Sequence, residues 1–63
     1  MSTEAKVQVK TCIGDILVDE IHDLSDSEAE ELGRRMAEVM PRQSGLYIVV
    51  IDSHDYQRRI DVN

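Results

Sequence analysis

The sequence predicts an α+β fold, a two-layer β-β-α-β-β sandwich in which one helix covers a four-stranded antiparallel sheet. Three observations predict it. Residues 6–13 alternate between apolar and polar side chains, which is typical of a strand with one buried face. An amphipathic repeat with three- and four-residue spacing fills residues 25–40, as in a surface helix. Residues 46–51 are apolar without a break and rich in β-branched side chains, which favours a strand.

The chain has 63 residues, near the lower limit for a domain that folds unaided. We therefore expect one small α+β domain over residues 1–63, with residues 1–5 as a frayed tail. The sequence has no Trp and no Phe, so the core must be aliphatic. The single cysteine, Cys12, excludes an internal disulfide, and no segment resembles a signal peptide or a membrane span. These features predict a cytoplasmic protein.

The first two strands are predicted to form a hairpin with a two-residue turn at Gly14-Asp15. Glycine in the first turn position readily adopts the positive φ that a type II′ turn requires. The pairs that follow from this turn are Ile13 with Ile16, Thr11 with Val18, Val9 with Glu20, and Gln8 with Ile21. Apolar residues then meet apolar residues next to the turn, which supports this register.

The helix is predicted to begin after Ser25. Ser25 can cap the helix, and Glu28, three residues later, completes a capping box. The apolar stripe that follows consists of Ala29, Leu32, Met36, Ala37, Val39 and Met40. Gly33 lies beside this stripe, where the lack of a side chain would let the helix approach the sheet closely. Pro41 ends the helix.

The last strand is predicted over residues 56–62, after a turn at residues 53–55. Its many charged side chains are typical of an edge strand. Placing the strand at residues 46–51 beside the first strand makes the whole sheet antiparallel, in the order 2-1-3-4. This order also places the two charge-bearing strands at the edges. The alternative order 1-2-3-4 requires one parallel pair.

The strand at residues 46–51 is apolar on both faces, whereas the single helix can cover only one face. The set predicted to be uncovered is Tyr47, Val49 and Ile51, flanked by Leu17 and Ile21. Burying three residues of this type contributes roughly 5–9 kcal/mol, comparable with the stability of a small domain. We therefore expect a homodimer whose sheets pack together through these five residues. In the alternative, loops and lysine side chains shield the face in a monomer.

The net charge is −6, and residues 11–33 contain no Lys or Arg. A field of this sign attracts basic protein surfaces and repels nucleic acid. We therefore expect another protein with a basic surface as the partner. The residues predicted to bind it are Asp19, Glu20, Asp23, Glu30 and Glu31.

Residues with catalytic or metal-binding chemistry are few and form no recognisable pattern. His22 and His54 each precede an aspartate, but both lie at predicted turns or strand ends, where polar side chains are common. No histidine is fixed beside Cys12. We therefore predict no catalytic residue, no metal site and no cofactor. An enzyme or metal binder built on His54 and Asp55 ranks last.

The predicted function is a non-catalytic protein–protein interaction module, a small acidic inhibitor or adaptor of a larger protein. The alternative is a small DNA-binding regulator that uses Arg58 and Arg59, because arginines on β-ribbons read DNA. The negative net charge and the scarcity of aromatic side chains weigh against nucleic acid as a partner. Nothing in the sequence points to a membrane.

Overall fold

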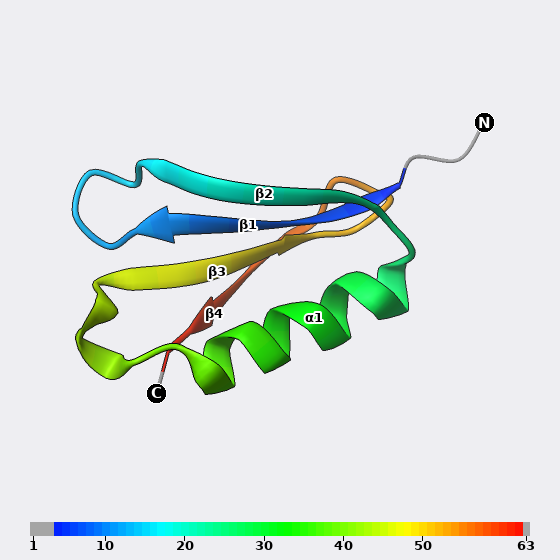
Figure 1. Cartoon of the computed structure of the whole chain (residues 1–63). Helices are drawn as coiled ribbons and strands as arrows, with labels where there is room; N and C mark the ends of the chain where they lie inside the picture. Colours follow the sequence, from blue (N-terminus) through cyan, green and yellow to red (C-terminus); the bar gives the residue numbers. More distant parts are fainter. Residues whose placement is uncertain (1–3, 63) are drawn as a thin grey trace.

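The computed structural model describes residues 4–62 and has the predicted α+β architecture (Figure 1). In chain order the elements are β1 (Ala5–Thr11), β2 (Leu17–Leu24), α1 (Asp26–Val39), the short 3-10 helix η1 (Arg42–Ser44), β3 (Leu46–Ile51) and β4 (Gln57–Asp61). The sheet has the order β2-β1-β3-β4, and every neighbouring pair is antiparallel, as predicted. Helix α1 packs against β3, β1 and β4, and β2 lies at the edge farthest from the helix (Figure 1).

The helix begins with the predicted capping box. The Ser25 hydroxyl accepts a hydrogen bond from the Glu28 amide at 3.1 Å, and the Glu28 carboxylate accepts one from the Ser25 amide at 3.0 Å. Gly33 lies close against the sheet, because an added Cβ would lie 2.5 Å from Val50 Cγ2. Val39, assigned to the apolar stripe from its spacing, is 80% exposed, so that assignment is wrong.

The core on the helix side of the sheet is aliphatic, as the composition requires. Its buried members are Ala5, Val7, Val9, Ala29, Ala37, Ile48 and Val50. The half-buried residues packed against them are Leu24, Leu32, Met36, Met40, Leu46 and Ile60. The strand at residues 46–51 therefore sends alternate side chains into this core, as predicted.

The predicted register of the first hairpin is wrong. Residues 12–16 form the loop, and Thr11 N donates to Ile16 O at 2.9 Å. Cys12 leaves the hairpin because its amide donates to Gly45 O at 2.8 Å. The observed pairs are Val9 with Asp19, Gln8 with Glu20, and Val7 with Ile21, with irregularities on either side of them. The longer loop thus shifts this part of the pairing by one residue.

The expected tail at residues 1–5 falls partly outside the described residues. Ala5 is the first residue of β1 and is buried in the core, so the prediction is wrong at this position. Among residues 4–62, no helix is long and apolar enough to cross a membrane.

Candidate protein-interaction surface

The sheet face opposite α1 carries the three residues predicted to be uncovered. Tyr47, Val49 and Ile51 form one cluster there, but each is only 6% exposed. Longer side chains on the neighbouring strands flank this row on both sides. The flanking residues in register are Lys6, Gln8 and Lys10 on β1 and Gln57, Arg59 and Asp61 on β4. The expectation of an uncovered face is therefore wrong, because these long side chains cover it within the monomer.

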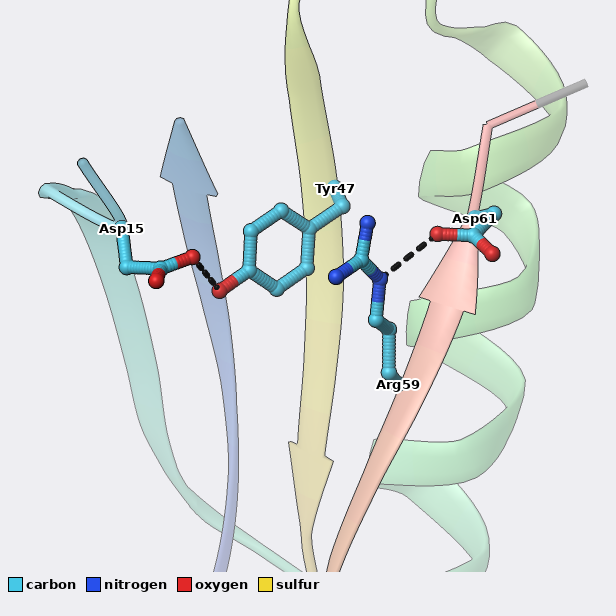
Figure 2. A network of polar contacts seen from close by, with 4 residues as sticks. All are labelled: Asp15, Tyr47, Arg59 and Asp61. Carbon is cyan, nitrogen blue, oxygen red and sulfur yellow. Dashed lines mark hydrogen bonds and ion pairs between the residues drawn. The ribbon is translucent and has the colours of Figure 1, made fainter. Parts of the chain in front are cut away.

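A polar network explains much of the cover over Tyr47 (Figure 2). The Arg59 guanidinium lies 4.1 Å from the centre of the Tyr47 ring, and Arg59 Nε donates to Asp61 Oδ1 at 2.7 Å. The Tyr47 hydroxyl donates to Asp15 Oδ1 at 2.7 Å, and this bond is the main cause that raises the pKa of Tyr47. The network joins the β1–β2 loop to β3 and β4. It stabilises a closed monomer face.

The register shift also moves one of the predicted dimer residues to the other face. Ile21 pairs with Val7, whose side chain is in the helix-side core, so Ile21 lies on the helix side of the sheet. Its placement beside Tyr47 is therefore wrong, since a one-residue shift reverses the face of a side chain. Leu17 pairs with Lys10 and does lie on the face opposite the helix, as predicted.

The five acidic residues predicted to bind a partner lie in three places. Asp19, Glu20 and Asp23 are all on β2, with Glu20 half-buried and the other two exposed. Glu31 lies on α1, where it lines an open groove with Leu24 and Leu32 and forms an ion pair with Arg35 at 2.8 Å. Glu30 lies on the other side of α1, facing β4. The five acids do not form one surface, because Asp19 pairs with Val9 on the helix side of the sheet and Glu20 pairs with Gln8 on the opposite face.

Both arginines of the alternative DNA-binding surface are occupied by contacts within the chain. Arg58 donates to Glu30 at 2.8 Å, and this contact holds the pKa of Glu30 below its usual value. Arg59 is engaged with Asp61 and the Tyr47 ring. Arg58 pairs with Val50 of β3, and Arg59 pairs with Val49. The side chains of the two arginines therefore lie on opposite faces of the sheet. They do not form one basic patch.

Four of the six exposed large apolar side chains among the described residues lie at the turn end of the first hairpin. Ile13, Ile16, Leu17 and Val18 are 89%, 63%, 49% and 56% exposed. This end of the hairpin lies away from α1 (Figure 1). Sequence reasoning identified only Leu17. The signal for the others was the consecutive run at residues 16–18, because three adjacent apolar residues in a strand cannot all face one core.

The histidines and the cysteine do not gather into a reactive site. His22 Nδ1 lies 3.3 Å from Asp23 Oδ2 on the exposed surface, and Cys12 is exposed in the first loop. In the β3–β4 loop the Asp52 carboxylate accepts hydrogen bonds from the amides of His54 and Tyr56 and so shapes the turn. Within residues 4–62, no group of three His, Cys, Asp or Glu side chains is placed to hold a metal ion.

A second contact ties the same loop to the helix. Asp26 accepts hydrogen bonds from the Ser53 amide at 2.8 Å and the Ser53 hydroxyl at 2.9 Å, and these bonds lower the pKa of Asp26. This end of the molecule is therefore fixed by internal hydrogen bonds, whereas the exposed apolar residues are at the opposite end of β2.

Comparison with known proteins adds no relative to this description. No family model, no curated protein and no solved structure matches the chain.

Proposed function

We propose that this protein is a non-catalytic protein–protein interaction module, a small acidic inhibitor or adaptor of a larger protein. One observation carries the proposal. The exposed apolar residues at the turn end of the first hairpin are followed along β2 by Asp19, Glu20 and Asp23. In the sequence, residues 11–33 contain no Lys or Arg. An apolar centre beside charged residues is typical of a surface that binds another protein.

The acids on β2 are expected to set the rate and specificity of association, while Leu17 and Val18 supply the apolar contact. A partner with a basic surface complements both features. Asp19, Glu20 and Asp23 lie along β2 next to Leu17 and Val18, and Glu31 lies on α1. Glu30 contributes to the overall field and not to the contact, because Arg58 already neutralises it.

Capture from a lysate of the source cell, compared between two matched variants, tests this proposal. Val18→Lys places a charge in the exposed hairpin end, and Val39→Lys places the same charge at an exposed apolar position on α1. We expect Val18→Lys to lose the specific partner and Val39→Lys to retain it. If the wild type and both variants capture the same partners in equal amounts, the hairpin end is not the binding surface.

Homodimerisation stays a prediction, and the mass in solution tests it. The covered state of Tyr47, Val49 and Ile51 removes the energetic argument for packing two sheets face to face, since little further apolar area would be buried. A dimer mass at high micromolar concentration that Val18→Lys converts to a monomer mass would place the self-association at the hairpin end instead.

A further inference from the structure

The outer edge of β2 is open in the described chain. β2 has eight residues and pairs on one side with β1, and no strand within residues 4–62 pairs with its other side. A strand at the edge of a sheet presents a row of unpaired amide and carbonyl groups that can bind a further strand. The edge lies away from α1, so the helix does not block access to it (Figure 1).

The residues of β2 protect this edge against only some strands. Natural edges are blocked by Lys, Pro, bulges and short length. β2 contains no Lys, Arg or Pro, but an irregularity interrupts its pairing with β1 on each side of Asp19–Ile21, so the regular part of this edge is centred on these three residues. Its charges are all acidic, namely Asp19, Glu20 and Asp23. Acidic side chains repel another acidic strand and attract a basic one.

This charge pattern selects the occupant. A second copy pairing through β2 would bring three acids of one chain against three of the other, which is unfavourable. A strand that carries Lys or Arg meets complementary charges instead. Leu17 and Val18 offer exposed apolar surface to its apolar side chains.

We propose that the outer edge of β2 binds an extended segment of a partner protein, in which basic and apolar side chains alternate, as a fifth strand of the sheet. This inference rests on the proposed function and names its mode of recognition. Main-chain hydrogen bonds to β2 supply the register, and the alternating side chains supply specificity. The acids Asp19 and Asp23 interact with the basic side chains.

A synthetic eight-residue peptide that alternates valine and lysine serves as the probe. We expect its addition to the ¹⁵N-labelled protein to shift the amide resonances of β2 and slow their hydrogen exchange, while the β4 amides stay unchanged. A peptide that alternates valine and glutamate should not bind. The valine–lysine peptide with every backbone nitrogen methylated should bind at least about tenfold more weakly, because neither of its edges can then donate main-chain hydrogen bonds to β2.

Variants of the protein test the charge requirement. Asp19→Asn and Asp23→Asn should each weaken binding of the valine–lysine peptide by roughly two- to fivefold, the range of a surface ion pair. Asparagine tolerates the positive φ of 64° at residue 23, so the backbone is preserved. Glu38→Gln removes one charge from α1 and should leave the affinity unchanged.

Two results would overturn the inference in different ways. Equal binding of the methylated and unmethylated peptides would exclude strand addition, and the proposed interaction function would still stand on the lysate experiment. Amide protection of β2 that rises with protein concentration in the absence of peptide would show a second copy at this edge and contradict the assignment to a basic segment. Failure of the wild type to capture any specific partner from the lysate would count against the proposed function itself.

Discussion

The two edges of the sheet are built differently. β4 has five residues, and its Arg58 pairs with Glu30 on α1 while its Arg59 covers Tyr47. β2 has eight residues, carries no Lys or Arg and exposes Leu17 and Val18. The arginines of β4 are therefore engaged with side chains of other elements, whereas Leu17 and Val18 of β2 are exposed to solvent or a partner.

The position of the helix explains this difference. α1 lies close against the sheet where Gly33 contacts Val50, with Ile60 and Ile48 nearby. This contact places the helix over β3 and its neighbours. One helix cannot cover four strands, so the strand farthest from it keeps exposed apolar side chains (Figure 1). A small domain of this shape thus has one closed edge and one open edge.

The largest expected effect is on the face between the two edges. Val49→Asp places a carboxylate at a position that is 6% exposed, in one cluster with Tyr47 and Ile51. We expect a loss of about 3 kcal/mol or more in the free energy of unfolding, measured by urea denaturation. Gln57→Asp, at an exposed position on the same face, is the control. A folded Val49→Asp variant that only changes oligomeric mass would restore the dimer interface predicted from sequence.

Gly33→Val tests whether the close contact of α1 with Val50 positions the helix over β3. The added side chain would collide with Val50, so we expect a loss of about 1–3 kcal/mol by chemical denaturation. Arg34→Val introduces the same side chain at the next, exposed position and should cost much less. If Gly33→Val is as stable as Arg34→Val, the helix can move without loss and the contact does not position it.

The closed edge should respond to acid. Because the pKa of Glu30 is lowered by Arg58 in the folded protein, the pair stabilises the fold above the pKa of Glu30 in the unfolded chain. This stabilisation is lost as the pH falls through the folded pKa. We expect the wild type to be more stable than Glu30→Gln at pH 7, with the difference shrinking as the pH falls below about 4.3, the ordinary pKa of glutamate. Glu38→Gln, whose carboxylate joins none of the ion pairs found among residues 4–62, should show no such difference.

The smallest effect is expected at the open edge. Val18→Lys should change the free energy of unfolding by no more than about 0.5 kcal/mol, because the side chain is already exposed to solvent. Thermal or urea unfolding of the isolated protein measures this directly. A larger loss would show that the hairpin end packs within the monomer, and the contrast between the two edges would then fail.

Much of the fold could be predicted because its signals are local. The capping box at Ser25 and Glu28 and the stop at Pro41 act within one helical turn. The apolar run at residues 46–51 marks a strand without reference to any other segment. The antiparallel order then follows from connectivity and the placement of charged strands. The predicted acids Asp19, Glu20 and Asp23 likewise lie on one strand, although the pairing places Asp19 and Glu20 on opposite faces of the sheet.

The register and the cover of each face depend on residues that are distant in the chain. Cys12 leaves the hairpin to bond with Gly45, and the resulting shift places Ile21 on the helix side. The cover over Tyr47 comes from Arg59 on β4 and from its bond to Asp15. Alternation in the sequence sorts side chains into two sets, because the period of a strand is two. Which set is covered, and by what, depends on contacts that form only when the strands are assembled.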